Sequence, residues 1–189
     1  MKNAGALVAK HVKESVDSSM PVLFLCGHGN NGGDGYIAAD ILQKDGFDVK
    51  LFSVKRPVTE ISKRALDNYS HKIYNIKEFD FSVAEPVLIV DCLLGSGIKG
   101  ELRTPYDELI NKVNKFENIL SVDVPSGFGT LNAVKPSQTI TFHEKKLGMD
   151  EMSCGEVFVV DVGFSSDIDI RFKKLPNGSL LKSPSKAAM

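Results

Sequence analysis

The sequence PVLFLC, residues 21–26, runs directly into GHGNNGGDG, residues 27–35. The first part is a short apolar run, which is typical of a fully buried strand. The second part is a glycine-rich turn, and apolar residues at helical spacing resume between Ile37 and Leu42. This succession of strand, glycine loop and helix predicts the first half of a βαβ unit.

The same alternation extends along the rest of the chain. Helical spacing covers 5–16, 59–70 and 106–116, whereas short apolar runs occupy 49–54, 87–90, 119–124, 140–142 and 157–162. Strands that alternate with helices of this length form right-handed βαβ units, whose parallel sheet is covered on both faces. We therefore predict an α/β fold, a Rossmann-like three-layer α/β/α sandwich with a mostly parallel central sheet.

Composition limits the domain organisation and the class of partner. The chain has 189 residues, which predicts one domain over 1–189, because single cores usually span roughly 100–200 residues. Residues 173–189 are polar enough to be a loosely held tail. With 23 basic and 24 acidic residues, the net charge is −1, so no overall field attracts nucleic acid or an anionic membrane. We expect neither as a partner.

Cysteines and apolar runs bear on the compartment. The 3 cysteines form no C-x-x-C pair, which argues against a disulfide framework or a thiolate zinc site. The longest apolar runs are far shorter than the ~20 residues that span a bilayer. The N-terminal segment lacks the pattern of a secretory signal. The expected location is the cytoplasm, with the mitochondrion as the alternative.

Polar segments follow three of the predicted strands. They are NNGGD at 30–34, DCLLGSGIKG at 91–100 and DVPSG at 123–127. In an open α/β sheet, ligands bind beyond the carboxyl ends of the strands, so these segments are the candidate site.

The first of these loops is suited to a phosphate. Its glycines let backbone N–H groups approach an anion at the start of the following helix, although a ligand-free tight turn is the alternative. Residues 27–32 also match the G-x-G-x-x-G dinucleotide fingerprint, but no acidic residue ends the second strand. Lys55 and Arg56 follow that strand instead and would suit a 2′-phosphate, or else they are solvated charges. His28 is interpreted as a solvated loop residue.

Two carboxylates end apolar strands, where burial is costly unless they are paired. Asp91 and Asp123 either cap the turns that follow them or, with Asn31 and Ser126, form a site of hard oxygen ligands for a cation. No His or Cys cluster supports zinc or iron.

Taken in order, these motifs resemble the NAD(P)H-hydrate epimerase family. The matching segments are 3–5, 27–35, 91–106, 123–127, 139–148 and 155–163. The resemblance implies an isomerase that interconverts the R and S forms of hydrated NADH and NADPH (NADHX and NADPHX), a repair activity. It also implies a bound potassium ion, a homodimer and functional coupling to a separate NAD(P)HX dehydratase.

The resemblance also assigns roles to residues. Potassium would be held by Asn31, Asp91 and Ser126. The hydrated nucleotide would be bound by Asn30, Asn31, Gly32, Gly33, Asp34, Gly95, Ser96, Gly97, Ile98, Lys99, Gly100, Glu101 and Asp123. Our candidate for the catalytic acid and base is Asp123, at a strand end beside the site.

Two other functions compete with this interpretation. One is a non-catalytic dimerisation and binding scaffold, similar to the related domain of mRNA-decapping scaffolds. The intact segment 30–34, with Asp91 and Asp123, favours catalysis instead. The other is a nucleotide-dependent oxidoreductase, which would need an acidic ribose ligand at the end of the second strand.

Overall fold

The computed structural model describes residues 1–82, 86–98, 100–163, 172–174 and 180–182. Its helices are α1 (Lys2–Ser15), α2 (Asn30–Lys44), α3 (Glu60–Asp67), the 3₁₀ helix η1 (Ile76–Glu78), α4 (Tyr106–Val113) and α5 (Glu151–Cys154). Its strands are β1 (Val22–Cys26), β2 (Val49–Ser53), β3 (Ile73–Asn75), β4 (Leu88–Cys92), β5 (Ile119–Val122), β6 (Gln138–Phe142), β7 (Glu156–Val160), β8 (Phe172–Lys174) and β9 (Leu180–Lys182).

Within the described residues, the strands form one sheet in the order β3-β2-β1-β4-β5-β6-β7-β9-β8. The pairs from β3 through β7 are all parallel, and β8 alone runs antiparallel to its neighbour β9. The mostly parallel sheet is therefore confirmed. The order reverses at β1, which lies between β2 and β4, and such a switch point is where open α/β sheets bind ligands.

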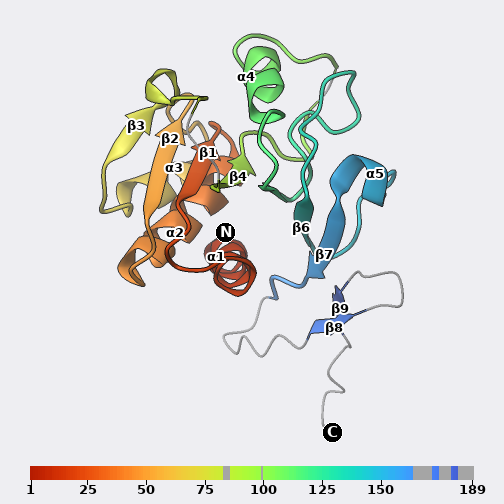
Figure 1. The fold of residues 1–189 in the computed structure, drawn as a ribbon, viewed down its shortest axis with the longest axis horizontal. Coiled ribbons are helices and arrows are strands. Elements are labelled where there is room, and N and C mark those ends of the chain that lie inside the picture. The colour runs from red at the N-terminus through yellow and green to blue at the C-terminus, as the bar shows by residue number, and fades with distance from the viewer. Residues whose placement is uncertain (83–85, 99, 164–171, 175–179, 183–189) are drawn as a thin grey trace, which may run out of the picture.

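Alternate residues of each central strand enter different cores. In β1, Phe24 packs with the α1 and α2 side, while Leu25 packs in the core that contains Ile110 of α4. Figure 1 shows α4 on the opposite side of the molecule from α1 and α2. A strand buried on both faces reads as an unbroken apolar run, which is the pattern of residues 21–26. This confirms the three-layer arrangement.

The structure adds elements that the sequence patterns did not predict. The strand β3 has 3 residues, none of them fully buried, so it carries no apolar run to mark it. In the predicted tail, residues of β8 and β9 form short strands, and the remainder of that prediction lies outside the described residues. No helix in the described ranges is long and apolar enough to cross a membrane.

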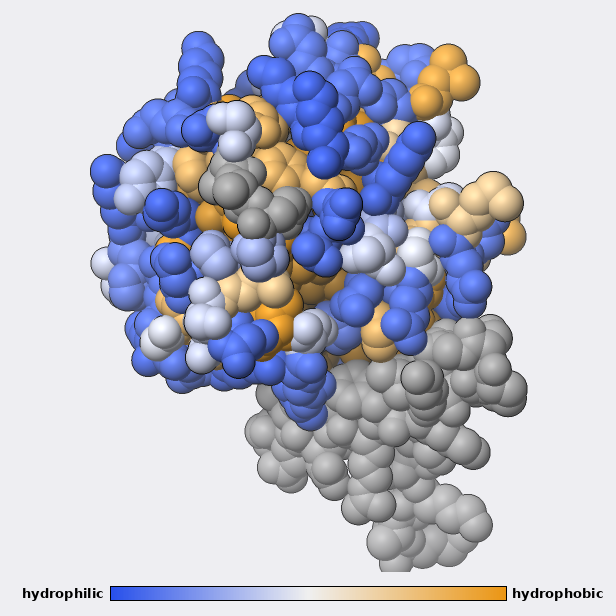
Figure 2. Space-filling model, viewed as in Figure 1, coloured by the Kyte–Doolittle hydropathy of each residue, from blue (hydrophilic) through white to orange (hydrophobic). Residues whose placement is uncertain are grey.

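Hydrophilic residues border the face drawn in Figure 2, and apolar ones gather toward its middle.

Candidate functional site

A cavity of about 640 Å³ opens beyond the carboxyl ends of β1, β4 and β5. Its volume is typical of a small-molecule site, for which roughly 300–1,000 Å³ is common. The lining residues are His28, Gly29, Asn30, Asn31, Asp34, Leu93, Leu94, Gly95, Ser96, Gly97, Ile98, Asp123 and Phe142. The three polar segments singled out in the sequence therefore contribute to one cavity at the switch point.

Close backbone contacts fix the glycine loop. A Cβ atom on Gly27 would lie 1.7 Å from the carbonyl oxygen of Leu93, and one on Gly32 would lie 2.1 Å from the carbonyl oxygen of Gly27. The Gly27 N–H also donates to the Cys92 carbonyl at 3.0 Å. These contacts require residues without side chains, and they hold the start of α2 against the loop that follows β4. The positive end of the helix consequently faces the cavity.

Asp91 connects the loops that surround the cavity. It is fully buried, and its carboxylate accepts hydrogen bonds from the Leu93 N–H, the Ser121 hydroxyl, and the N–H and hydroxyl of Ser126. Burial raises the pKa of Asp91, and these donors oppose that rise. The bonds join the loops after β4 and β5, and the bond from the Leu93 N–H is the turn cap expected of Asp91. Its role in a cation site stays a prediction.

Asn31 places its side-chain amide in the same hydrogen-bond network. Its amide nitrogen donates to the Leu94 carbonyl at 3.0 Å, which orients the side chain. Its Oδ1 is buried and has no hydrogen-bond partner within the described part of the chain. The Ser126 hydroxyl, which accepts from the Leu94 N–H at 2.8 Å, belongs to the same network. A buried oxygen without a donor is costly unless a cation or water satisfies it.

Asp123 is held in a defined position at the end of β5. Its φ of 68° lies in the left-handed region, which a non-glycine residue adopts only at a cost of about 1–3 kcal/mol. Its Oδ2 accepts from the Ser96 N–H at 3.1 Å, and its Oδ1 pairs with Lys146 Nζ at 3.1 Å. Lys146 also donates to the Phe142 carbonyl at 2.8 Å. The ammonium therefore holds the carboxylate at the edge of the cavity.

Asp34 is the second carboxyl group in the cavity. It is 8% exposed, and its Oδ1 has no hydrogen-bond partner among the residues described. Burial raises the pKa of Asp34 to about 7; the charge of the Met1 amine opposes this rise, and the charge of Asp123 adds to it. Asp34 therefore holds a proton over part of the neutral pH range.

This pKa predicts a pH-dependent stability that Asp34→Asn should remove. Because the folded pKa of about 7 lies above the usual 3.8, the wild type loses stability as the pH rises from about 4 to about 7. The asparagine variant stays neutral, so its free energy of unfolding should exceed that of the wild type at pH 8 by on the order of 4 kcal/mol. Urea unfolding of both proteins at pH 4.5 and pH 8 measures the difference. A gap of the same size at both pH values would contradict the assignment.

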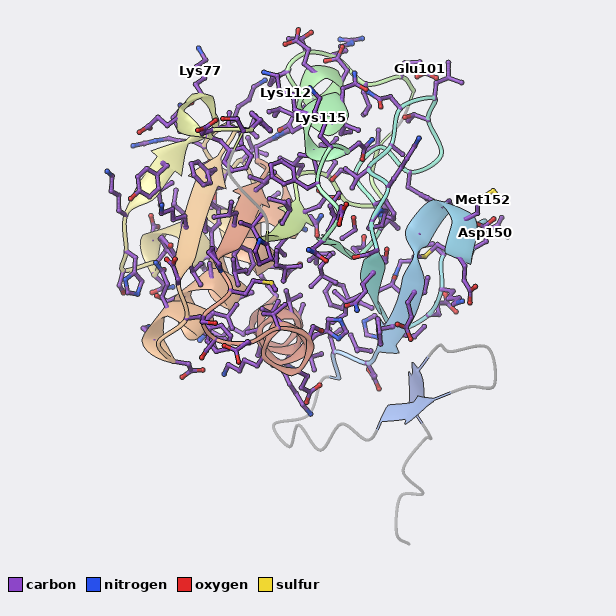
Figure 3. All side chains as sticks on the ribbon, viewed as in Figure 1. Lys77, Glu101, Lys112, Lys115, Asp150 and Met152 are labelled. Carbon is purple, nitrogen blue, oxygen red and sulfur yellow. The ribbon has the colours of Figure 1, made fainter. Side chains whose placement is uncertain are left out.

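The structure brings most of the predicted binding residues together, but not all. Asn30, Asn31, Asp34, Gly95, Ser96, Gly97, Ile98 and Asp123 line the cavity. Gly32 and Gly33 are buried inside α2, where they permit close packing and do not reach the cavity. Gly100 and Glu101 are exposed and outside its lining, and Figure 3 shows Glu101 at the outer margin. Lys99 lies outside the described residues.

His28 differs from its interpretation as a solvated loop residue. It is half-buried, lines the cavity, and its Nδ1 lies 2.6 Å from the hydroxyl of Tyr106. The two rings lie 5.9 Å apart. Tyr106 comes from α4, 78 residues away along the chain, so no local sequence signal indicates this contact.

Lys146 contacts Asp123 at the site, but the sequence patterns assign it no role. It lies in the polar loop after β6, a strand end that is not among the three polar segments of the predicted site. Applying the same rule, that ligands meet side chains beyond strand ends, to residues 143–146 would have indicated it. Phe142, at the end of β6, was missed for the same reason.

The sheet and cavity together define a class of protein: a Rossmann-like α/β protein with an oxygen-rich small-molecule site at the switch point of its sheet. The sequence pattern of one family, described as YjeF-related protein N-terminus, matches residues 1–148. The chain belongs to this family.

Similar proteins agree with this membership. The NAD(P)H-hydrate epimerase of Cenarchaeum symbiosum is 34% identical over 185 residues, which cover 89% of this chain and 86% of that protein. The bifunctional NAD(P)H-hydrate repair enzyme Nnr of Archaeoglobus fulgidus is 35% identical over 177 residues. The match covers 89% of this chain but 38% of that relative, so the chain spans well under half of the bifunctional protein. These relatives favour the epimerase interpretation over the scaffold.

A solved structure supports the fold. The crystal structure of yeast YNL200c superposes with a TM-score of 0.69, covering 85% of this chain and 75% of that one, at 23% identity.

Proposed function

We propose that this protein is an isomerase, an NAD(P)H-hydrate epimerase that interconverts the R and S forms of NADHX and NADPHX. The observation that supports it most is the pairing of Asp123 and Asp34 in one cavity at the switch point, where a dinucleotide would lie. The names of the similar proteins, NAD(P)H-hydrate epimerase and NAD(P)H-hydrate repair enzyme, agree with this proposal.

The cavity offers separate features for the two halves of such a ligand. The start of α2 and the amide of Asn30 suit the pyrophosphate oxygens. Ile98 and Phe142 provide apolar surface for the hydrated nicotinamide ring. Gly95 leaves room beside the carboxylate, because a Cβ there would lie 3.3 Å from Asp123 Oδ2.

The chemistry requires proton transfer at one hydroxyl. C6 of the adduct carries a hydroxyl group and a ring nitrogen, so protonation of the hydroxyl breaks the C6–O bond and releases water. The nitrogen lone pair stabilises the resulting cation. Water then adds to either face of the ring and gives up a proton, which inverts or restores the configuration.

Two carboxyl groups in different environments can divide this task. Asp34 holds a proton near neutral pH and can supply it to the departing hydroxyl. Asp123, opposite the ammonium of Lys146, takes a proton from the returning water and gives it back in the reverse reaction. Lys146 acts as a positioning residue for Asp123.

A potassium ion fits the buried network in its chemistry. Asn31 Oδ1 has no donor among the described residues, Ser126 contributes a hydroxyl oxygen, and Asp91 contributes a buried carboxyl group. The Asp91 carboxylate already accepts four hydrogen bonds, so direct coordination would require it to exchange one of them. The ion would neutralise the buried charge and fix the loops that surround the cavity. No cluster of three or more His, Cys, Asp or Glu side chains able to hold a metal occurs among the described residues.

This assignment predicts a potassium-specific stabilisation. Replacing tetramethylammonium chloride with KCl at about 100 times the dissociation constant should raise the melting temperature of the wild type by about 5–10 °C. Such binding contributes about 2.7 kcal/mol, and each kcal/mol shifts the melting temperature of a chain of this length by about 2–4 °C. Asn31→Ala should lose this increment, because it lacks the unused oxygen. Asn30→Ala is the matched control, because the amide oxygen of Asn30 is already bonded to Thr59. Equal increments in the three proteins would argue against the site.

One assay tests the proposed function. The purified protein is incubated with the R adduct and an S-specific dehydratase, which consumes only the epimer that the protein would produce. We expect loss of the R adduct at a rate proportional to protein concentration. Loss no faster than spontaneous epimerisation would support a non-catalytic role.

The remaining features of the proposal concern the whole protein. They are a single domain over residues 1–189, a homodimer, a cytoplasmic or mitochondrial location, and a separate NAD(P)HX dehydratase that consumes the S epimer. Fusion of both activities in the bifunctional relatives makes such coupling reasonable.

A further inference from the structure

A second cavity lies beyond the end of β2, separate from the catalytic one. It has a volume of about 420 Å³, and both Lys55 and Arg56 line it. These side chains are exposed, and neither forms an ion pair with any residue that the structure describes. The acidic residue in this cavity, Glu78, already accepts a hydrogen bond from the Asn75 N–H at 2.8 Å. The cavity therefore presents two cations that form no ion pair with the described part of the chain.

The backbone that carries these cations is tied to the catalytic loop. The Val54 N–H donates to the Cys26 carbonyl at 3.0 Å, and the Val58 N–H donates to the His28 carbonyl at 2.9 Å. Between these points, the Ser53 hydroxyl donates to the Lys55 carbonyl at 3.1 Å. The backbone that carries the two cations consequently has a fixed place relative to the glycine loop.

The sheet sets the spacing between the two cavities. Strand β1 lies between β2 and β4, and neighbouring strands are about 4.8 Å apart, so the ends of β2 and β4 are separated by about 10 Å. A dinucleotide spans such a distance. With its pyrophosphate at the start of α2 and its nicotinamide half beyond β4, its adenosine half would extend toward β2.

We propose that Lys55 and Arg56 bind the 2′-phosphate of the adenosine ribose, and that the enzyme therefore prefers NADPHX to NADHX. This inference rests on the proposed function for the placement of the nicotinamide half. A guanidinium can bind a phosphate through two parallel hydrogen bonds, and an ammonium adds a second positive charge. NADHX carries a hydroxyl at that position and gains neither interaction.

Binding of two simple nucleotides tests the subsite independently of catalysis. Adenosine 2′,5′-bisphosphate and adenosine 5′-monophosphate differ only in the 2′-phosphate, and calorimetry gives the ratio of their affinities. We expect the bisphosphate to bind at least about tenfold more tightly to the wild type. The double variant Lys55→Gln, Arg56→Gln should reduce this preference to near unity, and its melting temperature should stay unchanged because both side chains are exposed.

Lys77→Gln is the matched control. Lys77 is an exposed lysine of η1, close in sequence to Glu78 and outside the lining of this cavity, and Figure 3 shows it extending away from the ribbon. It should retain the preference for the bisphosphate. Equal affinities in the wild type would overturn the proposal, and so would a preference that survives in the double variant or that disappears equally in Lys77→Gln.

Measurements of turnover distinguish a failure of this inference from a failure of the proposed function. If the protein epimerises both adducts, kcat/KM should be at least about tenfold higher for NADPHX, and the double variant should remove that ratio. Turnover without any preference would refute the subsite alone. Selective binding of the bisphosphate without turnover would refute the epimerase function and leave the subsite supported.

Discussion

Asp123→Asn should lower kcat for epimerisation by about 10²–10⁴-fold, the usual contribution of general acid–base catalysis, while nucleotide binding remains measurable. The amide has nearly the shape of the carboxylate but cannot accept the proton from water. Its oxygen can still accept the Ser96 N–H, and asparagine tolerates the φ of 68° better than most residues. The fold around the site should therefore survive the change.

The coupled assay with the R adduct measures this loss, and calorimetry with NADP⁺ measures binding in the same preparation. Ser96→Ala serves as the control, because it keeps the backbone N–H that contacts Asp123 and removes only a side-chain hydroxyl. Its effect on kcat should be much smaller. Unaltered turnover in Asp123→Asn would remove this residue from the mechanism.

Gly27→Ala should lower the free energy of unfolding by at least about 3 kcal/mol, at the upper end of the cost of overpacking. The new Cβ would lie 1.7 Å from the Leu93 carbonyl oxygen, and the nearest atoms all belong to backbone, which cannot rotate away. Relief of the clash would have to separate the ends of β1 and β4. The cavity would then lose the contact between two of its three loops.

Gly29→Ala is the matched comparison for stability. This residue caps α2 with an extended φ of −92°, and a Cβ there would meet no atom within 4 Å. Its free energy of unfolding should stay within about 0.5 kcal/mol of the wild type. Urea unfolding of the three proteins gives the comparison, and similar losses in both variants would show that the clash at Gly27 does not determine the effect.

The sequence predicted the architecture because apolar runs buried on both faces are visible without any long-range information. All six predicted strands correspond to observed ones, and the helix expected from Thr59 begins there through a cap in which the Thr59 hydroxyl accepts the Ser62 N–H. The strand β3 escaped prediction because it is short and lies at the edge beside β2. Its pairing comes from the sheet and not from its own composition.

The site was predicted only in part, because strand ends indicate where side chains gather but not how they pair. Asp91 and Asp123 follow apolar runs and could be recognised. The raised pKa of Asp34 depends on burial by residues from several elements, and the ion pair between Asp123 and Lys146 joins loops 23 residues apart. Neither arrangement leaves a local pattern.

The hydrogen bonds that join the three loops have a consequence for ligand recognition. The Gly27 N–H, the Leu94 N–H and the Ser96 N–H each bind a group from a neighbouring loop, and none of these bonds involves a ligand. Ligand binding should therefore cost little conformational entropy, because these loops are already ordered. A rigid receptor of this kind discriminates by shape and charge at first encounter. Under the proposed function, it would bind a rare hydrated coenzyme among a large excess of intact molecules without a closing movement.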